Sequence, residues 1–249
     1  MKKVSFAAIS RKPFVVLAYP RTGSYLLVSL LQQFQGLRCY GEIFKRKALE
    51  LPSEDIKAIG ANLASRNAEP FVFLKQLFQL YPDQHCGFKF FPNHHADVRT
   101  WVTWSNQINR VVILRNPFEM YVSFSRVSAT GIWVDKHNKA KHRQPRIKFQ
   151  AESFDKMMRN ILNAQKLFKT TAEKRPESTI TITYDEIAAL EPVRQLAAFL
   201  GAASQPTKLE VPLRKQTTER YSELFENFDE LASHMRRNYP NICIDKHKL

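Results

Sequence analysis

The chain has 249 residues, of which 44% are apolar or aromatic, enough to close a full-sized core. Its 38 basic and 23 acidic residues give a net charge of +15, which indicates a polyanionic partner: nucleic acid, an anionic membrane or a phosphorylated small molecule. No segment approaches the roughly 18 uncharged apolar residues of a membrane span, and Arg11 and Lys12 interrupt the short apolar N-terminal stretch, which argues against a secretory signal. Cys39, Cys86 and Cys243 are too widely spaced for a zinc site and indicate reduced thiols in the cytoplasm.

Short apolar segments that alternate with helical ones predict an α/β fold, a three-layer α/β/α sandwich around a central, mainly parallel sheet. The predicted strands are 14–18, 37–41, 85–91, 111–114 and 179–183. The predicted helices are 24–34, 49–80, one that begins at Pro117, 153–173 and 191–200. Without a linker or repeat, residues 1–249 are expected to form a single domain, with a basic surface loop at about 135–150. Ligands of such folds bind at the carboxyl ends of the strands.

The segment YPRTGSY, residues 19–25, follows the first predicted strand. Gly23 permits a tight loop, and the helix after it presents unpaired N–H groups and its positive dipole end, which suit phosphate or sulfate. Arg21 adds a planar charged fork, and Thr22 and Ser24 add hydroxyl donors. The loop lacks the Gly-Lys-Ser/Thr ending of nucleotide triphosphatases. The alternative is a plain turn between core elements with a surface arginine.

A second segment, RVVILRNPFEMYVSFSR, repeats this pattern. Arg115 ends the strand, Asn116 is the expected helix cap, and Pro117 is the first helical residue. Ser123 lies about two turns into that helix. A strand-ending arginine is usually a solvated charge, but two such loops in one sheet fit a nucleotide with phosphates at both ends.

Together, YPRTGSYLLVSLL and VVILRNPFEMYVSFSR resemble the two cofactor motifs of sulfotransferases that use 3′-phosphoadenosine 5′-phosphosulfate. The segments GEIF, ATGIW, ITYDEI…LAAFLG and RKQTTERYSELFENFDEL are similar to carbohydrate sulfotransferases, above all the bacterial nodulation-factor and trehalose types. The likeness spans about residues 13–44, 86–134 and 153–231. It implies a P-loop NTPase-like sulfotransferase fold, and transfer of a sulfuryl group to a hydroxyl of a carbohydrate or glycolipid by in-line displacement, without a metal.

The resemblance also implies which residues bind the co-substrate. Those around the 5′-phosphosulfate would be Arg21, Thr22, Gly23, Ser24 and Tyr25. Those around the 3′-phosphate would be Arg115 and Ser123, with Arg214 and Lys215 closing over it, and Tyr184 would sit near the adenine.

The resemblance makes Glu42, at the end of the second strand, a candidate for the base that deprotonates the acceptor. His94 and His95 compete for this role, because cytosolic sulfotransferases place a catalytic histidine after a lysine-containing strand and GFKFFPNHH has that outline. Lys89 and Arg21 are candidates for steadying the transferring or leaving group. The ordinary alternatives are a Glu42 that caps a turn or pairs with a nearby lysine, a surface histidine pair, and a surface lysine with a buried stem.

Trp133, inside ATGIW, is a candidate for stacking on a sugar ring, whereas Trp101 is expected in the core. The basic loop at 135–150 is either a solvated loop or a dock for an anionic or lipid-linked glycan at a membrane surface. The expected location is therefore cytoplasmic, with a peripheral membrane association as an option.

Two other classes of function compete with the sulfotransferase interpretation. A P-loop nucleoside kinase-like phosphotransferase would need GxxxxGK[ST] and an acidic residue for magnesium, and neither is evident. A basic nucleic-acid-binding module would need basic residues interleaved with exposed aromatic ones. Here the charge is spread along the chain and most aromatic residues lie in apolar runs.

Overall fold

The computed structural model describes residues 9–133, 145–211 and 220–244. The described chain forms two compact units. The first consists of residues up to Tyr19, Gly23–Leu114 and Leu167–Glu210, and the second of Pro20–Thr22, Arg115–Lys166 and the residues from Val211 onward. The single domain that the sequence suggests stays a prediction.

A five-stranded parallel sheet forms the centre of the first unit, in the order β2-β3-β1-β4-β5. The strands are β1 (Phe14–Leu17), β2 (Leu37–Tyr40), β3 (His85–Phe90), β4 (Asn109–Leu114) and β5 (Thr179–Thr183). Every residue of β1 is buried, as expected for a central strand that is covered on both faces. The α/β class, the parallel sheet and all five predicted strands are confirmed.

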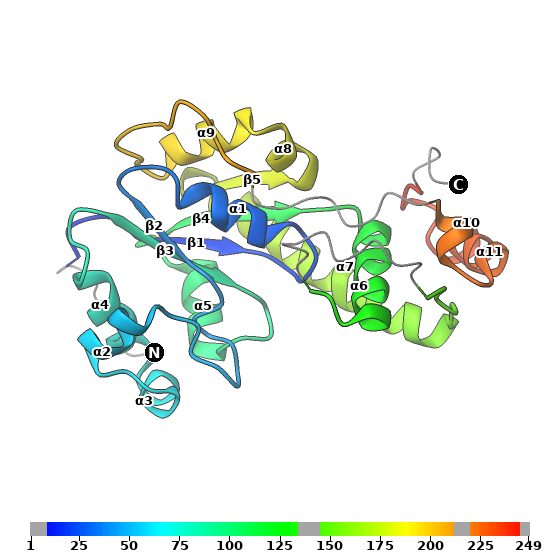
Figure 1. The fold of residues 1–249 in the computed structure, drawn as a ribbon, viewed down its shortest axis with the longest axis horizontal. Coiled ribbons are helices and arrows are strands. Elements are labelled where there is room, and N and C mark those ends of the chain that lie inside the picture. Colours follow the sequence, from blue (N-terminus) through cyan, green and yellow to red (C-terminus); the bar gives the residue numbers. More distant parts are fainter. Residues whose placement is uncertain (1–8, 134–144, 212–219, 245–249) are drawn as a thin grey trace. The chain divides into compact units, whose positions relative to one another are not determined.

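The order of the strands places helices on both faces of the sheet. The chain moves from β1 toward β2 in one direction and from β3 across β1 to β4 in the other, and right-handed crossovers then place the connecting helices on opposite faces. In Figure 1, α1 (Ser24–Leu31), α8 (Tyr184–Ala189) and α9 (Glu191–Phe199) lie on one face, and α5 (Ala96–Trp104) lies on the other. Because the strands are parallel, the loops after β1, β2 and β3 all leave the same edge of the sheet, the carboxyl edge.

The segment 49–80, predicted to be helical, contains three short helices: α2 (Ser53–Ile59), α3 (Leu63–Ala68) and α4 (Pro70–Gln79). The first break falls at Gly60, which ends α2 in a left-handed conformation with φ of 60°. Asn62 then caps α3 by accepting from the Ser65 N–H. The second break falls before Pro70, which cannot continue α3 and instead begins α4.

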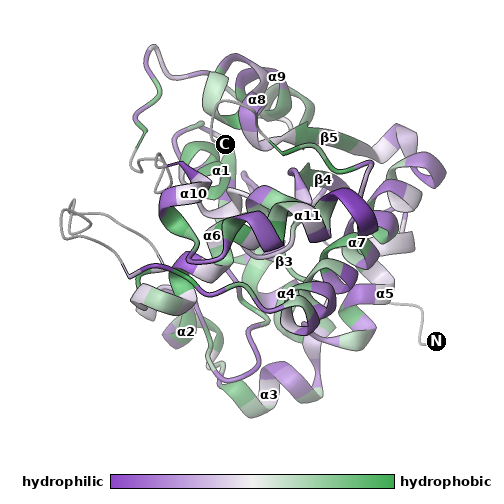
Figure 2. Cartoon of the chain, turned by 90° about the vertical axis from the view of Figure 1, so that its right-hand side faces the viewer, coloured by the Kyte–Doolittle hydropathy of each residue, from purple (hydrophilic) through white to green (hydrophobic). Residues whose placement is uncertain are grey.

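The second unit contains α6 (Pro117–Thr130), α10 (Tyr221–Leu224) and α11 (Phe228–Asn238), and α7 (Ala151–Lys174) continues from it into the first unit. The Asn116 side chain caps α6 by accepting from the Phe118 and Glu119 N–H groups, as predicted. Along α7, Phe154, Met158, Ile161 and Phe168 are buried at helical spacing. Figure 2 shows both hydrophilic and hydrophobic portions on this helix.

Candidate functional site

The loop between β1 and α1 combines left-handed backbone with the N-terminus of a helix. Arg21 has φ of 71° and Gly23 has φ of 86°, and the left-handed region is unfavourable for an arginine. Gly23 is the N-cap of α1 and has no side chain with which to cap the first N–H groups. Because these groups and the helix dipole favour negative charge, the loop can receive a phosphate or sulfate group.

Tyr184 packs directly on Gly23. A Cβ atom placed on this glycine would lie 2.6 Å from Cδ2 of the tyrosine ring, so a larger residue would displace the ring. The glycine is therefore required both for its backbone conformation and for this close approach. Tyr184 follows β5 directly and is the first residue of α8, whose capping box is formed by Thr183 and Glu186.

Arg21, Arg115 and Ser123 form a hydrogen-bonded group within the second unit, here called the arginine cluster. Arg21 Nε donates to Ser123 Oγ at 2.9 Å, although the two residues are 102 positions apart. Arg115 Nη1 donates to the Arg21 main-chain oxygen at 2.7 Å, and Arg21 Nη1 donates to the Trp133 main-chain oxygen at 2.7 Å. These bonds hold Arg21 in its unfavourable conformation. The two motifs that the sequence singled out thus meet in one group that carries two guanidinium charges.

The arginine cluster is supported by residues that the sequence did not point to. Arg115 Nη2 lies 3.5 Å from Glu119 Oε2, one turn further along the chain, and the Tyr221 hydroxyl donates to Glu119 Oε1. Gln165 Nε2 donates to the Arg115 main-chain oxygen at 2.5 Å. The spacing of Arg115 and Glu119 is an ordinary i, i+4 pair and was available from the sequence. The contacts of Tyr221 and Gln165 depend on tertiary packing.

Glu42, Lys89 and His94 form a second group, within the first unit, here called the glutamate cluster. Lys89 Nζ lies 2.9 Å from Glu42 Oε1, and His94 Nε2 lies 3.6 Å from Glu42 Oε2. Burial by itself would raise the pKa of Glu42, but the contacts from His94 and Lys89 outweigh it and lower the pKa to about 2. The carboxylate is therefore ionised at neutral pH and is surrounded by donors.

A hydrogen bond to His94 indicates which of its ring nitrogens carries the proton in the neutral form. The Phe91 N–H donates to His94 Nδ1 at 3.1 Å, so a neutral ring carries its proton on Nε2, the atom nearest Glu42. His94 is buried, and its Nε2 faces the Glu42 carboxylate at 3.6 Å. His95 instead directs Nε2 to the Asn67 main-chain oxygen at 3.1 Å and does not join the cluster.

The two tryptophans differ in exposure. The Trp133 side chain is exposed, and its ring packs edge-on against Phe124 with centroids 6.0 Å apart. Trp101 is buried and packs against Phe71, as expected for a core residue. Trp133 therefore has a surface that a ligand could cover.

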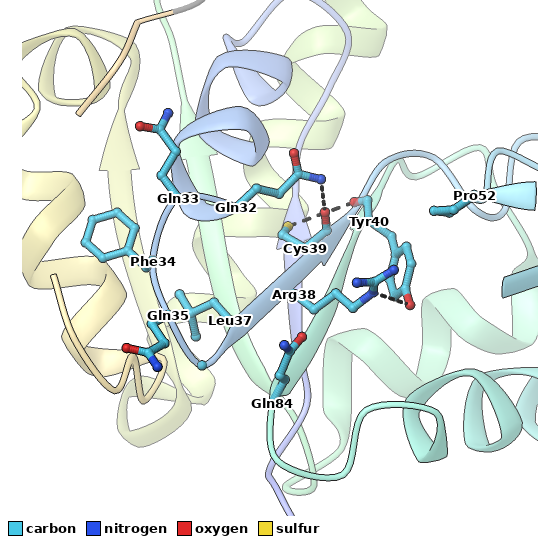
Figure 3. Close-up of a pocket in the computed structure, with 11 residues that line it drawn as sticks. Gln32, Gln33, Phe34, Gln35, Leu37, Arg38, Cys39, Tyr40, Pro52 and Gln84 are labelled. Carbon is cyan, nitrogen blue, oxygen red and sulfur yellow. Dashed lines mark hydrogen bonds between the residues drawn. The ribbon is translucent and has the colours of Figure 1, made fainter. Parts of the chain in front are cut away.

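A cavity of about 510 Å³ lies beside β2 and is lined by residues 32–40 with Pro52 and Gln84 (Figure 3). None of the predicted site residues lines it. Gln32 Nε2 donates to the Cys39 main-chain oxygen at 2.8 Å, and the Arg38 guanidinium pairs with the buried carboxylate of Asp55 at 3.0 Å. The charge of this arginine is therefore compensated by Asp55.

Some of the predicted site residues lie outside the described part of the chain. These are Arg214, Lys215 and most of the basic loop at 135–150. Among the described residues, no group of three or more histidine, cysteine, aspartate or glutamate side chains is placed to hold a metal ion. Within the same residues, no helix has the length and apolar character needed to cross a bilayer.

Comparison with known proteins identifies one relative that aligns over nearly the whole chain. The sequence is 24% identical over 240 residues to Nodulation protein H of Rhizobium tropici, and the alignment covers 90% of each protein. This similarity confirms the resemblance inferred from the motifs. No family model matches the sequence.

Two solved structures resemble the fold more distantly. Mouse sulfotransferase SULT7A1 complexed with PAP is 12% identical with a TM-score of 0.45, covering 96% of this chain and 92% of that one. Retinol dehydratase in complex with androsterone and inactive cofactor PAP is 10% identical with a TM-score of 0.45, covering 98% of this chain and 88% of that one. At these TM-scores, neither structure bears on the function of this chain.

Proposed function

We propose that the chain is a sulfotransferase that moves a sulfuryl group from 3′-phosphoadenosine 5′-phosphosulfate to a hydroxyl of a carbohydrate or glycolipid. The observation that carries this proposal is the arginine cluster, in which two motifs with the order and spacing of sulfotransferase cofactor motifs are joined by hydrogen bonds. The similarity to Nodulation protein H over 90% of each chain supports it. A carbohydrate acceptor follows from the narrower resemblance to nodulation-factor sulfotransferases.

The residues of the arginine cluster and the adjoining loop have the chemistry of a nucleotide site. In the proposal, the loop Arg21–Tyr25 binds the 5′-phosphosulfate, Arg115 and Ser123 bind the 3′-phosphate, and Tyr184 lies beside the adenine. Two guanidinium groups, the hydroxyl groups of Thr22, Ser24 and Ser123, and helix N–H groups suit an anion with phosphate at both ends. Arg214 and Lys215 would add further positive charge.

The glutamate cluster acts on the acceptor in this proposal. The co-substrate supplies the sulfuryl group, whose S–O bond to the nucleotide breaks as the acceptor oxygen bonds to sulfur. Glu42 takes the proton of the acceptor hydroxyl, and His94 positions the carboxylate through Nε2. Lys89 stabilises negative charge that develops on the transferring and leaving oxygens. A shift of the Lys89 ammonium toward that charge would weaken one of the contacts that keep the Glu42 pKa low, and Glu42 would become a stronger base.

The acceptor is proposed to contact Trp133. Trp133 offers an exposed aromatic face to a sugar ring. The basic loop near 135–150 is proposed to favour an anionic or lipid-linked acceptor at a membrane surface. Incorporation of labelled sulfuryl groups into a panel of glycans would identify the acceptor, and Trp133→Ala is expected to raise the KM for it without affecting nucleotide binding.

Thermal melting with three ligands tests the class of function. Adenosine 3′,5′-bisphosphate, tested with a chelator present, is expected to stabilise the fold by roughly 2.7 kcal/mol at about 100 times its dissociation constant. ATP with magnesium and a short DNA duplex are the comparison ligands. Stabilisation by ATP–magnesium alone would favour a kinase-like phosphotransferase, and stabilisation by DNA alone would favour a nucleic-acid-binding module.

A further inference from the structure

Arg66 is a fully buried arginine in α3 that lies outside every motif singled out in the sequence. Its side chain is 0% exposed. Nη1 donates to the Ile43 main-chain oxygen at 2.5 Å, and Nη2 donates to the Lys45 main-chain oxygen at 2.9 Å. The guanidinium carbon also lies 5.6 Å from the centre of the Phe44 ring. All these contacts are with the segment that follows Glu42.

A buried guanidinium is costly unless it is compensated, usually by a carboxylate. Burial lowers the pKa of Arg66 from its usual value, and no carboxylate among the described residues raises it again. Its compensation comes from the two carbonyl groups on either side of Phe44. The planar fork of arginine can reach both carbonyls at once, whereas a lysine ammonium has no such planar fork.

The segment that Arg66 holds contains the candidate base but has no regular secondary structure of its own. β2 ends at Tyr40, and residues 41–45 form a turn in which the Lys45 N–H donates to the Glu42 main-chain oxygen at 2.9 Å. At the start of the turn, the Gly41 main-chain oxygen accepts from the Lys89 N–H at 3.2 Å. The sheet thus anchors the start of the turn, and Arg66 anchors its end.

We infer that Arg66 is a positioning residue that fixes the turn 41–45 so that the Glu42 carboxylate keeps its contacts with Lys89 and His94. This inference rests on the proposed function, because it assigns Arg66 to the support of the proposed base. A carboxylate on an irregular turn needs such support, since a misplacement of about 1 Å at a reacting group can reduce turnover about 100-fold.

Replacement of Arg66 tests this role, with Arg66→Met removing both hydrogen bonds and Arg66→Lys retaining the charge. Turnover is expected to fall about 100-fold in Arg66→Met and about tenfold in Arg66→Lys, while the affinity for adenosine 3′,5′-bisphosphate changes less than about twofold. In carbon-13 NMR of labelled glutamate, the pKa of Glu42 is expected to rise from about 2 toward 4.5. Arg194→Lys is the matched control, because Arg194 also donates to main-chain oxygens, those of Pro206 and Thr207.

The outcomes separate the inference from the proposed function. Wild-type turnover together with an unchanged Glu42 titration in both Arg66 variants would overturn the inference, as would a loss of nucleotide affinity without a change at Glu42. If Arg66→Met does not fold, Arg66→Lys decides by the same two measurements. If the wild-type protein transfers no sulfuryl group, the proposed function fails, whereas the Glu42 titration still tests the positioning by Arg66.

Discussion

The arginine cluster and the glutamate cluster handle charge in opposite ways. The arginine cluster carries two guanidinium groups whose donors are directed to a hydroxyl and to main-chain oxygens, with Glu119 as the acidic neighbour of Arg115. In the glutamate cluster, a single carboxylate receives an ammonium and an imidazole. The first arrangement has positive charge to offer a bound anion, and the second holds a proton acceptor ionised. This difference matches the two tasks of the proposed reaction, binding a polyanion and deprotonating a neutral hydroxyl.

The largest expected effect follows from removing the carboxylate of the glutamate cluster. Glu42→Gln is expected to reduce turnover about 100-fold or more, because proton abstraction by a positioned base contributes roughly 10²- to 10⁴-fold. Nucleotide affinity is expected to remain within about twofold of wild type in calorimetric titration. Glu54→Gln, at an exposed position of α2, is the matched control. Retained turnover in Glu42→Gln would move the role of base to another residue.

The ion pairs of Glu42 also predict how stability depends on pH. The pKa falls from 4.5 to about 2 on folding, so the stabilisation is fully present above pH 4.5 and is lost as the pH falls toward 2. The difference corresponds to a free energy on the order of 3 kcal/mol. In urea unfolding, the free energy of unfolding of the wild type should exceed that of Glu42→Gln by this order at pH 6. The difference should close near pH 2. A gap that does not change with pH would contradict the low pKa.

Replacing a residue of the arginine cluster is expected to weaken nucleotide binding. Arg115→Met should weaken binding of adenosine 3′,5′-bisphosphate about 10- to 100-fold, because a hydrogen bond to a charged group contributes about 1.5–3 kcal/mol. Arg237→Met removes the same charge from an exposed position of α11 and serves as the control. Titration calorimetry at fixed ionic strength measures both. Equal losses of nucleotide affinity in the two variants would mean that the affinity depends on the net charge of the protein and not on the position of Arg115.

Ser123→Ala is expected to have the smallest effect. It removes the hydroxyl that accepts from Arg21 Nε, and a hydrogen bond of this kind contributes about 0.5–1.5 kcal/mol. Affinity for the bisphosphate should therefore fall about 2- to 10-fold. Ser233→Ala, on α11, provides a comparison at a distant position of the sequence. A loss as large as that of Arg115→Met would show that the serine also orders Arg21.

Much of the fold could be predicted because its signals are local. Buried parallel strands appear as short apolar runs, and Asn116 with Pro117 marks the start of α6. The segment 49–80 is helical as predicted, but Gly60 and Pro70 divide it into three helices. Both residues are visible in the sequence as helix-ending signals.

The sequence could name candidate residues for the site, but it could not predict which of them contact one another. Glu42 and His94 were rival candidates for the base, and the structure places them in one cluster, with a proton-bearing Nε2 on His94. Arg21 and Ser123 were assigned to opposite ends of the nucleotide, yet they are hydrogen-bonded to each other. Arg66 gave no sequence signal, since its role depends on two main-chain oxygens that only folding brings to it.

The most direct test of the central claim is a crystal structure of the protein with adenosine 3′,5′-bisphosphate. The account predicts the 3′-phosphate within hydrogen-bond distance of the Arg115 guanidinium and the Ser123 hydroxyl, and the 5′-phosphate at the N–H groups of the loop Arg21–Tyr25. A nucleotide bound elsewhere, such as in the cavity beside β2, with the arginine cluster making no contact to it, would contradict the account.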